Sequence, residues 1–405
     1  MTESFRFTYD PATLVYGRDC VAEELAVDLE RLGTERALVI SGTTVGTSEG
    51  TIGPVREGIG DRLSSVFAET TPDKRLRMAA DAAERIREED VDTLVALGGG
   101  SSLDVTAFAA IITAREIGYE EARAEFLDTG TVAIPDDATL LPIIVVPTTL
   151  SGADLSVVAG ITTIEDGELV RGAAFDGRLM PHAIYYDPAL YETTPHGVLC
   201  ASAMNGFDKG VETLYSPSGS PVTDGTAIRG LRLLGRGLPN LGDGKRDEET
   251  LYDSIVGTML VQYGFSRAIG PEAQTATVSI IHAFGHGIAR GYDIQQGGAH
   301  GIIAPHVLEY LFDNTDANRR FLAEALGVDS PEATPDETAA AVVDAVSDVA
   351  DALGLPERLR EISDMDESDL PKIAESVHGD TLMAMKPEEV DPSVDEIEAI
   401  LRAAW

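Results

Sequence analysis

A run of three glycines and two serines is the first pattern in this chain that could do chemistry. It spans Gly98 to Ser102, between a short apolar segment ending at Leu97 and an apolar stretch from 105 to 113. That order predicts a buried parallel strand, a turn and the start of a buried helix. Glycines let a ligand approach the backbone, and the N–H groups at a helix start attract anions. The pattern is typical of a phosphate site; the alternative is a tight turn that binds nothing.

Histidines form a second candidate group. Four of the seven lie within 25 residues: His282, His286, His300 and His306. His282 and His286 are four residues apart and therefore lie on one face of a predicted helix. A single histidine is usually a buried residue with its hydrogen bonds satisfied, but a cluster is harder to explain in that way. His306 follows Pro305, which favours a structural role for it.

The glycine run lies in an N-terminal half in which predicted strands alternate with helices. Residues 5–17 are expected to form a strand or hairpin, and 115–138 an irregular acidic insertion. The alternation predicts a parallel sheet that binds its ligand at the carboxyl ends of its strands. Further strands are expected at 37–41, 66–68, 91–97 and 140–146, and helices at 21–32, 75–89 and 105–113.

The pattern becomes mostly helical after Asp187-Pro188 and Pro195. We place a domain boundary at about residue 190, which gives an α/β domain at 1–190 and an all-helical domain at 191–405. Residues 364–392 are acidic and are expected to form a surface connection. Helices are expected at 198–215, 223–236, 247–267, 271–290, 299–312, 316–326, 336–353 and 393–404.

Charge is the unusual feature of the composition. The 405 residues include 69 acidic and 30 basic side chains, a net charge of −39 spread over the whole chain, and only five of the basic residues are lysines. Dispersed acidity with few lysines is typical of a halophilic protein, because high salt screens the self-repulsion. Such a surface repels DNA, RNA and anionic membranes, so neither nucleic acid nor membrane is an expected partner.

Neither a targeting segment nor a disulfide framework is expected. The first ten residues lack the apolar segment of a signal peptide, and no apolar stretch reaches the roughly 18 residues that span a bilayer. Cys20 and Cys200 are the only cysteines, too few for a disulfide framework or a cysteine metal site. We expect a soluble, cytoplasmic protein.

Several blocks in order make the chain resemble the iron-containing alcohol dehydrogenase family, which has the dehydroquinate synthase-like fold. An ordered set of this kind is more specific than any one block. The resemblance implies hydride transfer between NAD(H) or NADP(H) and a small alcohol or carbonyl in a cleft between two domains. It is also compatible with a homodimer. The blocks are Gly98 to Asp104, Val146 to Thr149, Asp187-Pro188 with Pro195, Asn205 to Tyr215, and His282 to His306.

The resemblance also assigns residues to the cofactor. It implies that Gly99, Gly100 and Ser101 hold the pyrophosphate, with Asp104 nearby. It further implies that two residues after the strand at 140–146 contact the cofactor, namely Thr148 and Thr149.

One position bears on the choice between NAD and NADP. The family often has an acidic residue just after the second strand, where it binds the adenosine ribose. The matching residue here is Gly42, followed by Thr43 and Thr44. Without a carboxylate a 2′-phosphate meets no repulsion, and the two hydroxyls could donate to it, which favours NADP(H). The alternative is an ordinary loop glycine.

The metal site of the family is not kept. Typical members bind Fe²⁺ or Zn²⁺ through an Asp, a His four residues later and two more distant His. Aligned on Glu212, the chain has Asn205 and Lys209 at the first two positions, His282 at the third and Gln296 at the fourth. An ammonium has no lone pair to give a metal, so no metal is expected.

A shifted alignment would keep two oxygen ligands. Using Asp208 and Glu212 could still bind a divalent ion with a histidine, but it breaks the match of Glu212 and Tyr215. The shifted alignment stays an alternative.

Lys209 is our first candidate catalytic residue. Negative charge develops on the substrate oxygen during hydride transfer to a carbonyl, and a metal normally stabilises it. A buried ammonium at the same place can stabilise that charge and also donate the proton, and desolvation lowers its pKa toward the working range. Lysines are rare in this chain, and the neighbours of Lys209 are the apolar Phe207 and Val211. The alternative is a solvated helix residue.

The histidines are expected to assist Lys209. The position of His286 in the family lies near the nicotinamide, and His282 keeps a ligand position. His300 resembles the second His of a His-x-x-x-His in maleylacetate reductases, a branch that also has the Asn of Asn205 and a block of the same length at Pro147 to Ser156. That branch is thought able to work without a metal.

The leading prediction is thus a metal-independent alcohol dehydrogenase or carbonyl reductase. One alternative is a reductase of a maleylacetate-like keto acid, for which Arg267 or Arg290 would supply the cation. Others are a lyase or synthase that uses NAD⁺ transiently, and a non-catalytic dinucleotide-binding relative. The substrate is not predicted.

Overall fold

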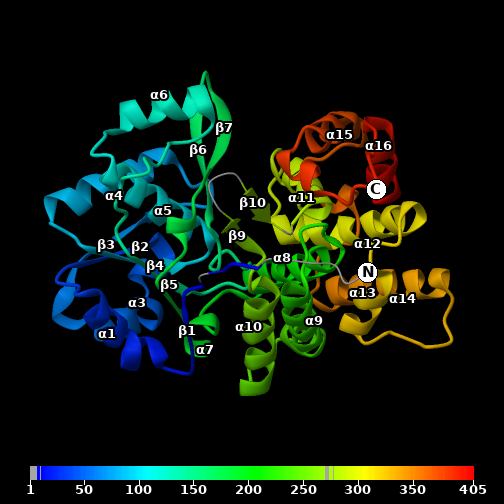
Figure 1. Cartoon of the computed structure of the whole chain (residues 1–405), viewed down its shortest axis with the longest axis horizontal. Coiled ribbons are helices and arrows are strands. Elements are labelled where there is room, and N and C mark those ends of the chain that lie inside the picture. Colours follow the sequence, from blue (N-terminus) through cyan, green and yellow to red (C-terminus); the bar gives the residue numbers. More distant parts are fainter. Residues whose placement is uncertain (1–6, 10, 270–272, 277) are drawn as a thin grey trace.

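The structure is a computed structural model that describes residues 7–9, 11–269, 273–276 and 278–405, with the backbone alone for 266–269 and 273–276. An α/β half and a helical half lie side by side along the long axis of the molecule (Figure 1). The expected fold class is confirmed. The domain boundary at about residue 190 stays a prediction.

Six parallel strands form the sheet of the α/β half, in the order β1-β8-β5-β4-β2-β3. Gly98 pairs with Pro147, and Gly42 pairs with Thr70, so four strands end at one edge of the sheet. The turns that follow these strands are thereby brought together. The strands are β1 (Thr13–Tyr16), β2 (Ala37–Gly42), β3 (Leu63–Thr70), β4 (Thr93–Gly98), β5 (Ile143–Pro147) and β8 (Ala183–Tyr186).

Helices cover both faces of this sheet because its strands are apolar on both sides, as expected for parallel strands. Val39 and Ile40 of β2 belong to different clusters of buried side chains, one on each face. On one face lie α1 (Cys20–Leu32) and α3 (Glu49–Ile59), and on the other α4 (Leu76–Glu88) and α5 (Gly100–Ala114). The shorter helices of this half are α2 (Thr43–Thr47), α6 (Tyr119–Thr129) and α7 (Pro188–Tyr191).

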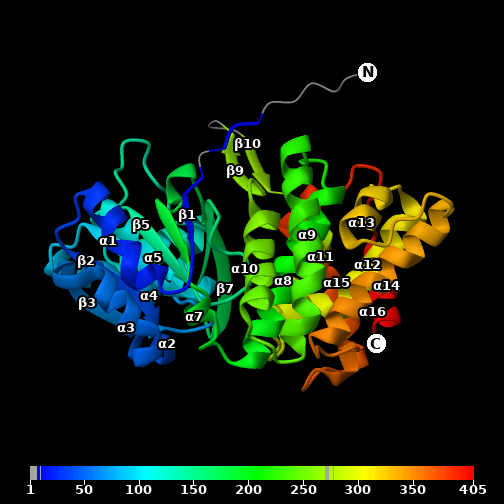
Figure 2. The same ribbon diagram turned by 90° about the horizontal axis from the view of Figure 1, so that it is seen from below.

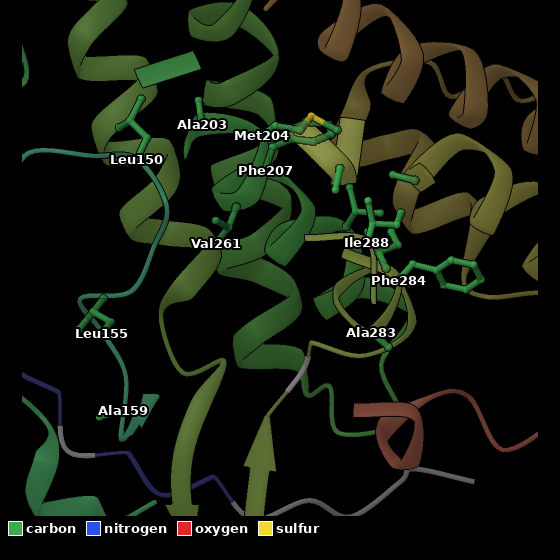
Figure 3. Close-up of a cluster of buried hydrophobic side chains, with 14 of the residues drawn as sticks. Leu150, Leu155, Ala159, Ala203, Met204, Phe207, Val261, Ala283, Phe284 and Ile288 are labelled. Carbon is green, nitrogen blue, oxygen red and sulfur yellow. The ribbon is translucent and has the colours of Figure 1, made fainter. Parts of the chain in front are cut away.

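The second half is built from helices that pack around α8 (Figure 2). One cluster of buried side chains runs from Leu150 in the loop after β5, across Ala203 and Phe207 of α8, to Phe284 (Figure 3). The loop after β5 is therefore packed against the helical half. The helices are α8 (His196–Tyr215), α9 (Pro221–Gly242), α10 (Glu248–Gln262), α11 (Ile280–Ala289), α12 (Gln296–Asn314), α13 (Arg319–Leu326), α14 (Pro335–Ala352), α15 (Leu370–His378) and α16 (Val394–Ala403).

Short elements complete the described fold. The 3₁₀ helices are η1 (Gly60–Arg62), η2 (Gly177–Leu179), η3 (Leu359–Glu361), η4 (Glu367–Asp369) and η5 (Thr381–Met385). Two antiparallel hairpins are formed by β6 (Val158–Glu165) with β7 (Glu168–Phe175), and by β9 (Ser266–Ile269) with β10 (Ala273–Ala276).

Four expectations about secondary structure are wrong. Residues 115–138 are not wholly irregular, because α6 forms there and buries Ala122 and Phe126. Residues 364–392 are not a surface connection, because α15 buries four apolar residues at helical spacing. The helices expected at 247–267 and 271–290 are each shorter, since α10 ends before Gly264, whose φ is +81°, and β9 and β10 follow. The hairpin of β6 and β7 was not predicted.

None of the helices in the part of the chain that the structure describes has the length and apolar character needed to cross a membrane.

Candidate active site

The glycine run forms the N-terminus of α5 at the carboxyl edge of the sheet. Gly98 has a φ of +130°, which favours glycine, and Gly99 precedes the first helical residue, Gly100. A Cβ on Gly99 would lie 3.2 Å from the Thr149 side chain, and one on Gly100 would lie 3.2 Å from Ala153. These close approaches explain why the loops after β4 and β5 need small residues where they meet.

The other residues assigned to the cofactor lie around this helix start. The Thr148 N–H donates to the Gly98 carbonyl at 3.1 Å, which ties the two loops together. The Ser101 hydroxyl donates to Pro72 O at 3.4 Å. Asp104, one turn further into α5, forms an ion pair with Lys74, a residue that the sequence did not single out.

Gly42 and Thr43 lie at the same edge of the sheet, at the end of β2 and the start of α2. The Thr43 hydroxyl donates to Ala68 O at 2.9 Å, whereas Thr44 is exposed. The Thr43 hydroxyl, one of the two expected to donate to a 2′-phosphate, thus already donates to a backbone carbonyl. The missing carboxylate remains as the sequence argument for NADP(H).

Lys209 is buried rather than solvated, since only 8% of it is exposed. Its Nζ donates to the Gly152 carbonyl in the loop after β5 and lies 4.8 Å from the centre of the Phe265 ring. Burial lowers the pKa of Lys209 to about 8, although the negative charges of Asp154 and Asp104 act to raise it. The ammonium therefore lies between α8 and the loops at the carboxyl edge of the sheet.

The loop that contacts Lys209 has its own polar support. Gly152 has a φ of +69°, and a Cβ there would lie 2.6 Å from the Gln262 side chain. Asp154 accepts from the Tyr186 hydroxyl and from Gln262 Nε2 at 3.5 Å. Burial raises the pKa of Asp154. Sequence analysis missed these residues, although Gly152 and Asp154 lie in the block that resembles the family.

His282 is held between a carboxylate and an amide. Its Nδ1 is hydrogen-bonded to Glu212 Oε2, and its Nε2 lies 3.1 Å from Asn205 Oδ1. Glu212 Oε1 accepts backbone N–H groups at the start of α11, with that of Ile281 at 2.9 Å. Burial, with the nearby His300 and Lys209, lowers the pKa of His282 well below its usual range, and burial raises that of Glu212 to about 7.

His300 lies directly behind His282, with 4.4 Å between the ring centres. Its Nδ1 is 3.1 Å from Asp208 Oδ2, but the angles are not those of a hydrogen bond, and neither side chain has a hydrogen-bond partner among the described residues. Burial raises the pKa of Asp208 and lowers that of His300 to about 3. Both shifts favour the neutral forms of these two groups.

His286 lies one turn further along α11 and is outside this buried cluster. Its side chain is 38% exposed, and its Nδ1 lies 3.2 Å from Asp380 Oδ2. Asp380 also forms an ion pair with Arg290. Burial alone would raise the pKa of Asp380, but the hydrogen bond with His286 and the charge of His286 lower it. Asp380 was missed because its segment was expected to be a surface connection.

Two arginines meet where β7 approaches the end of α11. The Arg171 guanidinium donates to the backbone carbonyl of Arg290 at 3.3 Å. Burial and then the charge of Arg290 lower the pKa of Arg171, which places two like charges close together. The side chain of Arg267, the other cation expected from the sequence, lies outside the described residues.

The four residues that the sequence alignment assigned to the family's metal positions come from three helices, α8, α11 and α12. Gln296 opens α12 and lies against α11, because a Cβ on Gly285 would be 3.4 Å from its Cγ. Within the described ranges, no group of three or more His, Cys, Asp or Glu side chains is arranged to hold a metal ion.

Comparison with known proteins gives relatives over the full length of the chain. It is 26% identical over 403 residues to maleylacetate reductase of Pseudomonas aeruginosa, covering 99% of this chain and 98% of that one. It is 23% identical over 398 residues to NAD-dependent methanol dehydrogenase of Bacillus methanolicus, covering 97% and 98%. The structure of sulfoacetaldehyde reductase from Bifidobacterium kashiwanohense with NAD⁺ is similar in fold, with a TM-score of 0.82, 20% identity and coverage of 99% of both chains.

Sequence models of one family match both halves of the molecule. Iron-containing alcohol dehydrogenase matches residues 11–188. The C-terminal part of the Fe-containing alcohol dehydrogenase family matches residues 199–405. The chain therefore belongs to the iron-containing alcohol dehydrogenase family of oxidoreductases.

Proposed function

We propose that the protein is an NAD(P)-dependent alcohol dehydrogenase or carbonyl reductase that works without a metal, with Lys209 in place of the metal. The observation that carries the proposal is the buried ammonium of Lys209, which donates to the Gly152 carbonyl. It lies between α8 and the carboxyl edge of the sheet, where Gly98 to Gly100 are found; we call this the glycine edge. Family membership supports the oxidoreductase class, and the side chains around Lys209 support the particular chemistry.

The glycine edge suits a dinucleotide. The loops of Gly98 and Thr148 are joined by a hydrogen bond, and no side chain caps α5. Side chains at Gly99 and Gly100 would be in tight contact with the loop after β5. An anion is stabilised at such a helix start. The cofactor is then NAD(H) or NADP(H), and the missing carboxylate at Gly42 favours NADP(H).

Iron does not suit the residues at the family's metal positions. Lys209 has no lone pair to donate while it is protonated, and the amides of Asn205 and Gln296 are weak ligands. Both ring nitrogens of His282 are already engaged, one with Glu212 and the other with Asn205. The proposed reaction therefore involves no metal.

Lys209 has two tasks in the proposed reduction. A bound NAD(P)H supplies the hydride. The Lys209 ammonium donates a hydrogen bond to the carbonyl oxygen, stabilises the negative charge that develops there, and gives it the proton that completes the alcohol. The amine that remains is reprotonated with the help of His282, His300 and the half-exposed His286, which can exchange protons with water. In alcohol oxidation the same steps run backwards.

A keto acid is the second candidate substrate. The favouring observation is the pair Arg171 and Arg290 near His286, in a chain with a net charge of −39. Arg290 is paired with Asp380, whereas the hydrogen bond of Arg171 goes to a backbone carbonyl, so Arg171 could bind a carboxylate. The name of the maleylacetate reductase relative points to the same class.

The test is steady-state oxidation of NADPH and NADH by the purified protein with matched neutral and acidic carbonyl compounds, together with elemental analysis and a chelator. We expect turnover that is independent of bound iron or zinc. Higher kcat/KM for the acidic member of each pair would favour the keto acid. Activity that follows the metal content would overturn the metal-free mechanism, and cofactor binding without turnover of any compound would favour a non-catalytic relative.

A further inference from the structure

We infer that Asp154 is the positioning residue of Lys209: its carboxylate is the buried counter-charge of the ammonium, and its loop turns the Gly152 carbonyl toward Nζ. The inference rests on the proposed role of Lys209. It assigns a task to a residue that the proposed mechanism does not otherwise use.

The loop after β5 is fixed on three sides. The Leu150 N–H donates to Ser202 Oγ of α8 at 3.0 Å. Two residues on, the Gly152 carbonyl accepts from Lys209. Asp154 is then anchored to Tyr186 of β8 and lies 3.5 Å from Gln262 of α10. This short loop therefore connects the sheet with α8, which carries Lys209, and with α10.

Three carboxylates act on the Lys209 charge; Asp154 has the largest effect, and Asp104 is paired with another cation. Asp104 forms an ion pair with Lys74. Glu212 is bonded to His282 and to several backbone N–H groups. Asp154, only 4% exposed, has neutral donors alone among its hydrogen-bond partners in the described structure.

A buried carboxylate without a bonded cation is costly unless a positive charge lies nearby. Lys209 is the cation beside this loop, because its Nζ donates to the Gly152 carbonyl two residues before Asp154. In keeping with this, the charge of Asp154 acts to raise the pKa of Lys209, and the charge of Lys209 acts to lower that of Asp154. Two imidazoles also lie near Lys209, those of His282 and His300. Burial lowers their pKa values, so they do not supply the positive charge in its place.

The opposing interpretation is that Asp154 is only a hydrogen-bond acceptor for Tyr186. Asp154→Asn separates the two, because the asparagine keeps an acceptor for the Tyr186 hydroxyl. Its new N–H₂ group faces Gln262 Nε2, so the long 3.5 Å bond from Gln262 is lost. The substitution thus removes the charge while the bond from Tyr186 can persist.

The experiment is a double-mutant cycle on kcat for carbonyl reduction, with Asp154→Asn, Lys209→Met and both together. We expect Asp154→Asn to lower kcat by about tenfold or more and to leave the Kd of the reduced cofactor unchanged. In the Lys209→Met background the same substitution should change kcat by less than about twofold, because a residue that acts through Lys209 has nothing left to act on.

Asp28→Asn is the matched control. Asp28 is also buried and accepts from a tyrosine of the same strand, Tyr185, at 2.7 Å, but it lies on α1, far from Lys209 in the fold. We expect it to leave kcat unchanged.

Three results would contradict the inference. They are an Asp154→Asn protein with wild-type kcat, an equal loss in both backgrounds, and a protein that no longer folds or binds cofactor, since this last result would assign Asp154 to the fold. A wild-type kcat in Lys209→Met would instead overturn the proposed function itself.

Discussion

At the scale of the residue, the proposed function depends on a cation, Lys209, taking the part that a metal plays in typical members of the family. Lys209 and the carboxylates of Glu212 and Asp208 lie on one helix, within two turns, and all three are buried. Burial pushes each toward its neutral form, so the pKa of Lys209 falls while those of the two acids rise. Lys209 and Glu212, with pKa values of about 8 and about 7, can therefore exchange protons near neutral pH.

The pH dependence follows from the direction of the Lys209 shift. The pKa is lowered to about 8, so the ammonium is complete below that pH and is lost as the pH rises through it. We therefore expect kcat for carbonyl reduction to fall above about pH 8, because the proton donor disappears. Steady-state kinetics with saturating cofactor would measure this, and a kcat that stays level to about pH 10 would contradict it.

At the scale of the element, the loop after β5 and the helix α8 decide where Lys209 points. The left-handed conformation of Gly152 turns its carbonyl toward the ammonium, and the Gln262 side chain fills the space that a Cβ would need. Position 152 therefore needs glycine for two reasons: its backbone is left-handed, and a Cβ would have no room beside Gln262.

Gly152→Ala is expected to lower both the melting temperature and kcat. Left-handed backbone costs a non-glycine residue about 1–3 kcal/mol, and the contact with Gln262 must also be relieved by moving the loop. Gly244→Ala is the control, since Gly244 has a φ of +84° but open space around a Cβ. It should lower the melting temperature less and leave kcat unchanged, and equal effects of the two would show that the loop does not position Lys209.

Element by element, the sequence was informative where periodicity is strong. The glycine turn, the buried strands and the helices α1, α4 and α5 follow from apolar runs and spacing. It failed where charge masks a short apolar face, as in α6 with Ala122 and Phe126, and in α15. The helix expected through 247–267 was too long because Gly264 ends it and a hairpin follows.

The candidate site was predictable in part. Lys209 and the histidines stand out by type and scarcity, and the structure brings His282 and His300 together beside Lys209. Their carboxylate partners were not predictable, because Asp154, Glu212 and Asp380 reach them from segments far apart in the chain. In a chain with 69 acidic residues, the presence of an Asp or Glu does not by itself indicate a functional residue.

At the scale of the whole molecule, the α/β half and the helical half share one cluster of buried side chains. This packing brings the glycines at the start of α5 and Lys209 of α8 to the same region between the two halves. The loop after β5 belongs to the sheet by connection and to the helical half by packing, as Leu150 shows beside α8 (Figure 3). The sheet supplies the helix start that suits a dinucleotide, and the helices supply the ammonium and imidazoles. Neither half contains both.

The most direct test of the central claim is kcat for carbonyl reduction by Lys209→Met at about pH 7, with cofactor affinity measured in parallel. Removal of a charge-stabilising proton donor should lower kcat by about a hundredfold or more and leave the Kd of NADPH or NADH within about twofold. The fall of kcat above about pH 8 should disappear as well. A variant that keeps wild-type kcat, or whose loss is restored by adding Fe²⁺ or Zn²⁺, would contradict the account.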